Sequence, residues 1–175
     1  MKKYELTENV KEVCGRKLFQ IKALKDFSGV KAGELGGWIE KEENLSQDGN
    51  AWVCGDARVY GSARVCGDAM VSGSARVYGD AKVCGDAVLR GGVKVKKTTD
   101  YVLAGPAGSR AAVTTFVPGD DMVFCGCFSG TLEEFVARVE ETHEGQALFL
   151  SQYRSMVHFF RWMRETLNVL EQKGK

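Results

Sequence analysis

The chain is poor in proline, in histidine and in long apolar segments. Of its 175 residues, 2 are Pro and 2 are His, against 21 Gly, so glycine is the expected turn residue. No apolar run reaches the ~18 residues that span a bilayer, and the first residues, MKKYELTENVKE, lack the apolar segment of a secretory signal. We therefore expect no membrane association, a cytoplasmic location, and reduced thiols at all 6 cysteines.

Neither sign of charge dominates the chain. It holds 24 basic and 23 acidic residues, for a net charge of +1. The balance is uneven, because residues 51–98 contain 8 basic and 4 acidic residues, whereas residues 99–175 contain 7 and 10. The basic middle is compatible with an anionic partner, nucleic acid included, although such charges more often form a solvated face.

A six-residue repeat fills residues 51–98. In order, its units are AWVCGD, ARVYGS, ARVCGD, AMVSGS, ARVYGD, AKVCGD, AVLRGG and VKVKKT. The first position is Ala in all but the last unit, and the third is Val or Leu throughout. Residues two apart lie on one side of a short strand, so these positions point inward and the residue between them points outward. The Gly-Asp and Gly-Ser pairs form the corners.

This repeat resembles the hexapeptide-repeat left-handed β-helix, in which three units make one triangular coil. The resemblance implies a mainly β fold, a short left-handed parallel β-helix, because one unit alone cannot bury its apolar side. Residues 18 apart then stack at about 4.8 Å. One outward face carries Trp52, Met70 and Val88 as an exposed apolar stripe, which predicts an oligomer interface. The resemblance implies a homotrimer.

The other two outward faces of the predicted coil are basic. One carries Arg58, Arg76 and Lys94, with Tyr60 and Tyr78 beside them. Stacked Arg and Tyr could bind anions or bases, but Arg stems resting on neighbouring rings are the commoner arrangement. On the last face, Cys66 and Cys84 stack. We interpret them as small ladder residues rather than as a metal or disulfide site.

The repeat divides the chain into three predicted segments. Residues 1–38 form an N-terminal β cap with a strand at Leu18–Leu24, residues 39–98 the β-helix, and residues 99–175 a small α+β domain. In this last domain we expect two helices. The first follows a capping box of Thr131 and Glu134 and stops at Gly145. The predicted strands are Tyr101–Leu103, Ala112–Val117 and Met122–Phe128, and the second helix is Gln146–Glu171.

A second resemblance covers most of the chain. The stretches GELGGWIEKEENLSQDGNAWV (Gly33–Val53), GSR (Gly108–Arg110) and CGCFSGTLEEF (Cys125–Phe135) accompany the repeat. In this combination the chain resembles phage and prophage proteins of unknown function. The resemblance implies a phage context inside a bacterial host cell, and it implies no activity.

Two polar segments of residues 99–175 predict an anion site. Ser129, Gly130 and Thr131 precede a helix, whose free N-terminal amides attract phosphate or carboxylate. Ser109 and Arg110 would join them if the preceding hairpin brings Arg110 close, with Thr115 or His143 nearby. The alternative is a capped helix and a structural Arg–Glu pair. We expect no cofactor.

A zinc site is an alternative use of the same region. Cys125 and Cys127 on one strand would point their sulfurs to one face, and His143 and His158 would complete four ligands. Zinc sites normally have wider Cys spacing, so the competing interpretation is a pair of small buried thiols. No metal is therefore assigned.

Enzymes of the hexapeptide class depend on histidines that this repeat lacks. Its acyltransferases use a His on or beside the coils and often an extruded loop, and its γ-class carbonic anhydrases use more histidines than the 2 present. We therefore favour a non-catalytic oligomeric binding protein that blocks or sequesters a host defence protein or a nucleotide-like anionic ligand. The alternatives are an acyltransferase with His143 as general base and a structural virion or assembly component.

Overall fold

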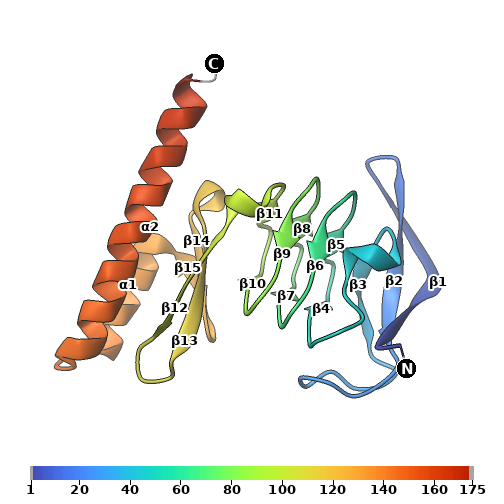
Figure 1. The fold of residues 1–175 in the computed structure, drawn as a ribbon, viewed down its shortest axis with the longest axis horizontal. Coiled ribbons are helices and arrows are strands. Elements are labelled where there is room, and N and C mark those ends of the chain that lie inside the picture. Colours follow the sequence, from blue (N-terminus) through green and yellow to red (C-terminus); the bar gives the residue numbers. More distant parts are fainter. Residues whose placement is uncertain (1, 174–175) are drawn as a thin grey trace. The chain divides into compact units, whose positions relative to one another are not determined.

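The computed structural model describes residues 2–173, with side chains up to residue 167, and consists of two compact units. Unit 1 is Met1–Thr99 and unit 2 is Asp100–Lys175. Unit 1 contains the repeat, and its secondary structure elements are nearly all strands (Figure 1). Unit 2 combines a small sheet with two helices. Each unit is described by itself below.

Unit 1 begins with a hairpin that leads into the coils. β1 (Tyr4–Val13) pairs antiparallel with β2 (Arg16–Ala23), and β2 pairs antiparallel with β3 (Leu35–Ile39). β3 then pairs in parallel with β5 (Arg58–Val59), with Trp38 opposite Arg58. The hairpin therefore closes one edge of the first coil, because it supplies the backbone partners that an exposed edge would lack.

Two-residue strands with parallel partners form the three faces of the solenoid. Their register is offset by 18 residues throughout: Trp52 lies opposite Met70, and Met70 opposite Val88. The predicted stacking of the repeat is thus confirmed. The remaining strands of the coils are β4 (Trp52–Val53), β6 (Arg64–Val65), β7 (Met70–Val71), β8 (Arg76–Val77), β9 (Lys82–Val83), β10 (Val88–Leu89) and β11 (Lys94–Val95).

Small apolar side chains fill the inside of the coils. The Ala and the Val or Leu of every unit from Ala51 to Leu89 have no exposed surface. Backbone amides tie each coil to the next, as in the bonds from Arg58 N to Ala75 O and from Arg76 N to Val93 O, both 2.9 Å. The corner glycines adopt the left-handed conformation, for example Gly73 at φ +69°. The repeat pattern therefore accounts for the whole interior of this segment.

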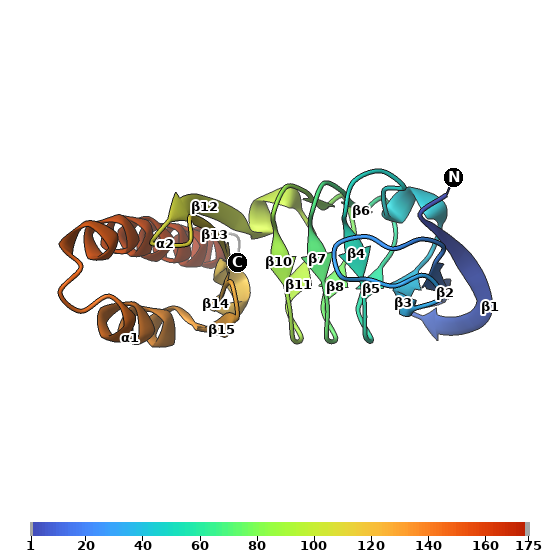
Figure 2. The same ribbon diagram turned by 90° about the horizontal axis from the view of Figure 1, so that it is seen from below.

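The expectation that Trp52 is exposed is wrong. Its side chain is 2% exposed, because the loop between β2 and β3 folds over this end of the stripe (Figure 2). The ring of Phe27 meets the Trp52 ring edge-on at 5.3 Å, and the Tyr4 ring lies at 6.3 Å. Met70 and Val88 remain partly exposed. The predicted apolar stripe is therefore shortened to these two residues.

The expectation of reduced thiols fails for one pair of cysteines. Cys66 and Cys84 form a disulfide between successive coils, with Cα atoms 4.7 Å apart. Residues stacked 18 apart are held at the strand spacing, which lies inside the range that a disulfide can bridge. The free cysteines are Cys14, Cys54, Cys125 and Cys127.

Unit 2 is an antiparallel sheet with two helices packed on one face. The strands β12 (Val102–Ala107), β13 (Ala112–Val117), β14 (Met122–Cys125) and β15 (Phe128–Thr131) lie side by side in chain order. The core between sheet and helices includes Phe116 and Phe160, whose rings stack at 4.8 Å. The strand expected over Met122–Phe128 is in fact two strands, because the chain turns at Gly126 and Cys127.

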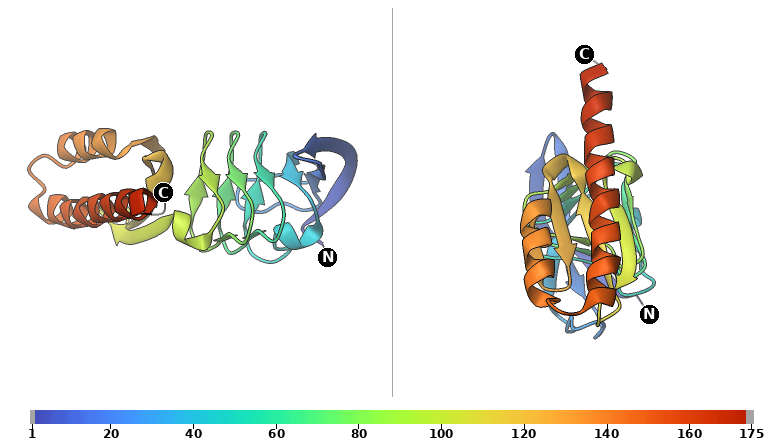
Figure 3. Two further views of the ribbon diagram at one scale, coloured as in Figure 1. Left: turned by 90° about the horizontal axis from the view of Figure 1, so that it is seen from above. Right: turned by 90° about the vertical axis from the view of Figure 1, so that its left-hand side faces the viewer.

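The two helices differ in length. α1 (Leu132–Thr142) begins at the predicted capping box. α2 (Ala147–Lys173) is much longer and extends past the N-terminal end of α1 (Figure 3). Their contact with the sheet uses Leu132, Phe135 and Val139 of α1 and Tyr153, Met156 and Val157 of α2. Within residues 2–173, no helix combines the length and the apolar character that crossing a membrane would need.

Candidate functional site

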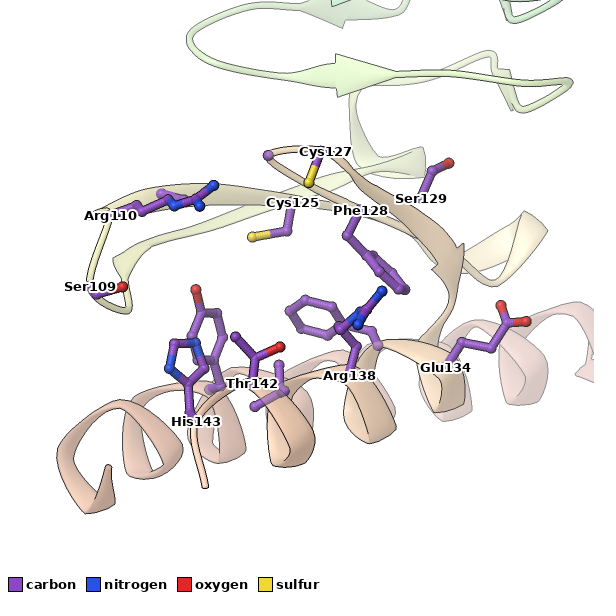
Figure 4. Close-up of a pocket in the computed structure, with 15 residues that line it drawn as sticks. Ser109, Arg110, Cys125, Cys127, Phe128, Ser129, Glu134, Arg138, Thr142 and His143 are labelled. Carbon is purple, nitrogen blue, oxygen red and sulfur yellow. The ribbon is translucent and has the colours of Figure 1, made fainter. Parts of the chain in front are cut away.

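A pocket of about 690 Å³ lies in unit 2 between the sheet and the helices (Figure 4). Its walls come from the β12–β13 loop, the β14–β15 turn, α1 and Tyr153 of α2. Several residues expected to form a site line it: Ser109, Arg110, Cys125, Cys127, Ser129 and His143. Gly130, Thr131 and Thr115 do not.

The loop that carries Ser109 and Arg110 is fastened to α2. The Gly108 amide donates to Gln152 Oε1 at 2.9 Å, and the Tyr153 hydroxyl donates to Ala107 O at 3.3 Å. Gly108 has φ +71°, and a Cβ there would lie 2.4 Å from the Tyr153 hydroxyl. Only glycine therefore allows this close approach without strain. The loop consequently holds Arg110 beside the pocket in a defined place.

Arg110 differs from the other arginines whose side chains are described in unit 2. Each of the others has a carboxylate partner: Arg138 with Glu141 at 3.1 Å, and Arg154 with Glu140, Arg161 with Glu133 and Arg164 with Asp121, each at 2.9 Å. Within the described residues Arg110 is exposed and forms no ion pair. A guanidinium without a carboxylate partner at the edge of a pocket can donate two parallel hydrogen bonds to the carboxylate or phosphate of a ligand.

The helix start does not provide the anion site expected there. The predicted capping box is confirmed, and the Glu134 carboxylate accepts from the Thr131 amide at 2.7 Å and from its hydroxyl at 3.0 Å. These donors lower the pKa of Glu134, so the helix start already holds a negative charge. Figure 4 shows Ser129 at the opposite end of the pocket from Arg110, with its hydroxyl pointing away from the pocket.

Aromatic rings form the interior of the pocket. Phe128 of β15 meets Phe135 of α1 at a ring separation of 5.4 Å, and Phe135 meets Tyr153 edge-on at 5.8 Å. Burial first, and then the neighbouring Cys125 thiol, raises the pKa of Tyr153 to about 12, so its hydroxyl is neutral at physiological pH. The charge of Arg110 acts in the opposite direction on the pKa of Tyr153.

His143 lies at the end of α1 with its ring largely buried. The ring stacks on Tyr153 at 5.2 Å, and its Nδ1 lies 3.0 Å from Gln146 Oε1. The amide oxygen can only accept, so Nδ1 donates this hydrogen bond and Nε2 is the nitrogen that Gln146 leaves open. His143 is therefore a structural residue at the helix end whose second nitrogen is the one available for chemistry.

The structure does not assemble the ligands of the alternative zinc site. Within the described residues, no three His, Cys, Asp or Glu side chains are close enough to hold a metal ion. Cys125 ends β14 and Cys127 lies in the following turn, so the two sulfurs do not share the face of one strand. His158 lines a separate depression on α2 with Arg154 and Ser155. The turn at Gly126 is the physical reason that the zinc alternative is not supported.

Sequence reasoning missed four residues that define the pocket: Phe128, Phe135, Arg138 and Tyr153. Glu134, Arg138 and Thr142 follow at spacings of four, which places them on one face of α1. That spacing was the available signal for Arg138. Nothing comparable in the sequence marks Tyr153, which reaches the pocket from α2 only through the packing of the helices.

The basic face of the solenoid is partly neutralised. Arg58 pairs with Asp56, which also pairs with Lys11. Tyr60 and Tyr78 stack face to face at 5.4 Å, as residues 18 apart should. This ladder is therefore explained by contacts within the unit, and unit 2 contains the better candidate site.

The family comparison matches part of the repeat. Residues 51–66 and 63–79 match the YdcK beta-solenoid repeat. A stretch of 61 residues is 43% identical to the "Uncharacterized acetyltransferase YdcK" of Escherichia coli (strain K12). That match covers 30% of this chain and 19% of the relative's length. Together with the register of the coils, it shows that the chain is a hexapeptide-repeat β-solenoid protein.

Proposed function

We propose that this chain is a non-catalytic, oligomeric binding protein. In this proposal a left-handed β-helix is the scaffold, and the pocket of unit 2 holds an anionic small molecule. The observation that carries the proposal is Arg110, whose guanidinium has no carboxylate partner within the described residues, beside a pocket of about 690 Å³. That volume falls within the ~300–1,000 Å³ usual for small-molecule sites.

The proposed setting is a phage or prophage protein in the cytoplasm of a bacterial host, where binding would sequester a nucleotide-like ligand or block a host protein. Its support is the resemblance over Gly33–Val53, Gly108–Arg110 and Cys125–Phe135. A homotrimer is part of the proposal. It now depends on Met70 and Val88, because Trp52 is covered within its own chain.

Native mass spectrometry of the full chain purified from its host tests the proposal. We expect a discrete oligomer that carries an anionic small molecule, and we expect Arg110→Gln to lose the molecule while keeping the oligomer. Arg154→Gln is the matched control, because Arg154 is exposed and lies outside this pocket. Retention of the molecule by Arg110→Gln would show that the pocket assignment is wrong.

An acyltransferase is the second candidate. Two observations favour it: the similarity to the acetyltransferase-named protein of Escherichia coli, and the position of His143 in the pocket with Nε2 outside the hydrogen bond to Gln146. Incubation with acetyl-CoA and amine or hydroxyl acceptors should then release free thiol, and His143→Gln should abolish this release. Equal release by both proteins, or none, would remove the candidate.

A structural virion or assembly component is the remaining candidate. It predicts open-ended polymers of the full chain in electron micrographs. Discrete particles would instead agree with the closed oligomer of the main proposal.

A further inference from the structure

The chemistry of the pocket walls indicates which kind of anion the site would accept. This inference rests on the proposed binding function. The walls divide into two regions. Near Arg110 they are polar, with the guanidinium and the Ser109 hydroxyl at one end of the pocket (Figure 4). Further in, the side chains of Phe128, Phe135 and Tyr153 leave carbon surface.

The aromatic region is bounded from two sides. Figure 4 shows Phe128 reaching down from the sheet, with α1 and α2 below it. Phe135 and Tyr153 come from those helices and are themselves fixed by the core, at 2% and 6% exposure. Rings held in this way lose little conformational freedom when a flat group enters, which favours an aromatic ligand over a flexible chain.

The charges of the pocket fix which end the anion occupies. The Glu134 carboxylate lies at the end away from Arg110, where it is occupied by the Thr131 amide and hydroxyl. Arg138 already has Glu141 as a partner at 3.1 Å. An incoming anion is therefore repelled at the Glu134 end and attracted at the Arg110 end.

We propose that the pocket binds a planar aromatic ring that carries an anionic group, with the ring against the half-buried Phe128 and the anion on the Arg110 guanidinium. Two sources share this chemistry, a nucleoside monophosphate and a simple aryl phosphate or aryl carboxylate. Stacking of one base on an aromatic side chain raises affinity on the order of tenfold to a hundredfold. The ring should therefore matter as much to affinity as the charge.

Isothermal titration calorimetry of the full chain tests the ligand class. The probes are adenosine monophosphate, adenosine, phenyl phosphate, benzoate, octanoate and inorganic phosphate. Adenosine monophosphate or an aryl anion should bind at least tenfold more tightly than octanoate, adenosine or inorganic phosphate. Preference for the nucleotide over phenyl phosphate and benzoate identifies the first source, and the reverse order identifies the second.

Two variants test separately what aromatic stacking and what the positive charge contribute to affinity. Phe128→Leu keeps the apolar volume but removes the stacking face, so it should weaken aromatic anions at least tenfold and leave octanoate unchanged. Arg110→Gln should weaken every anion at least tenfold, and Arg154→Gln should change none. Circular dichroism of each variant confirms that it is folded before binding is compared.

Failure of the aromatic ligand class and failure of the proposed binding function would give different results. Octanoate binding as tightly as the aryl anions, still dependent on Arg110, would overturn the aromatic class and leave the proposed binding function in place. Binding that does not change in Arg110→Gln would overturn both. Absence of binding by all six probes would overturn the aromatic class, and the proposed function would then be decided by the native mass spectrometry.

Discussion

The two units reach a stable interior by different routes. In unit 1 each coil repeats the same small contacts, and from β4 to β11 the parallel register keeps an offset of 18 residues. In unit 2 the core depends on residues far apart in the chain, such as Phe116 on β13 and Phe160 on α2. The irregular packing of unit 2 leaves the pocket of about 690 Å³ between its sheet and helices. The difference explains why the candidate site is outside the repeat.

The largest expected effect comes from the core of unit 2. Phe160 is fully buried, so Phe160→Ala should lower the free energy of unfolding by about 3–5 kcal/mol. In the solenoid, Val77→Ala removes fewer buried atoms than Phe160→Ala. It should therefore lower the free energy of unfolding by roughly 2 kcal/mol. Urea denaturation followed by circular dichroism measures both. Phe159→Ala is the control, because Phe159 is 38% exposed. Equal costs for Phe160→Ala and Phe159→Ala would contradict the described core.

The second prediction concerns the Cys66–Cys84 disulfide, which fastens two coils that the backbone already joins. Replacing both cysteines with Ser should lower unfolding stability by about 2–3 kcal/mol under non-reducing conditions, since the bond closes a short loop in the unfolded chain. The difference should vanish in dithiothreitol. Cys54→Ser, at an unpaired position, should have little effect. A variant as stable as the wild type without reductant would show that the bond does not form.

The third prediction separates backbone conformation from coil spacing. Gly73 and Gly91 both have positive φ, but a Cβ at Gly73 would lie 2.8 Å from the Gly91 amide nitrogen, whereas one at Gly91 meets nothing within 4 Å. Gly91→Ala should therefore cost about 1 kcal/mol, and Gly73→Ala about 2 kcal/mol more. Thermal and urea unfolding provide the comparison. If Gly73→Ala and Gly91→Ala lower the free energy of unfolding equally, the close approach of the coils at Gly73 does not affect stability.

The smallest expected effect is a pH dependence in the N-terminal cap. Lys3 Nζ donates to Ala51 O at 2.9 Å, and burial, followed by the charge of Lys25, lowers the Lys3 pKa to about 8. The unfolded chain keeps this proton up to about pH 10.4, so between pH 8 and 9.5 it binds more protons than the folded chain. Unfolding stability should therefore rise over this interval, by on the order of 1 kcal/mol.

Lys3→Met should remove this rise, and Lys2→Met should keep it, because Lys2 is exposed and pairs with Glu42. The measurements end at pH 9.5 because Tyr4 has the opposite effect at higher pH. Burial raises the pKa of Tyr4 in the folded chain, so the unfolded chain loses this proton first and the free energy of unfolding then falls. Urea midpoints at several pH values give the slope for each protein. A slope shared by all of them would assign the effect to another group.

Individual residues show how far the sequence could be interpreted. The inward Ala and Val positions, the offset of 18 residues and the capping box at Thr131 follow from spacing alone, and each is confirmed. Trp52 and the turn at Gly126 were predicted wrongly. The first is covered by Phe27, which is 25 positions earlier in the chain, and the second depends on pairing between β14 and β15. Local patterns contain no information about such contacts.

The sequence by itself determined the coil, because a repeat needs only its neighbours and one unit specifies the next. It also determined the start of α1 and the residue types from which a site could be built. Only the tertiary structure decided which of these residues meet. The packing of α2 against the β12–β13 loop brings Tyr153 beside Gly108, and the capping box occupies the helix start. Arg110 is left without a carboxylate partner among the described residues, and Glu134, at the opposite end of the pocket, is held by its own helix start.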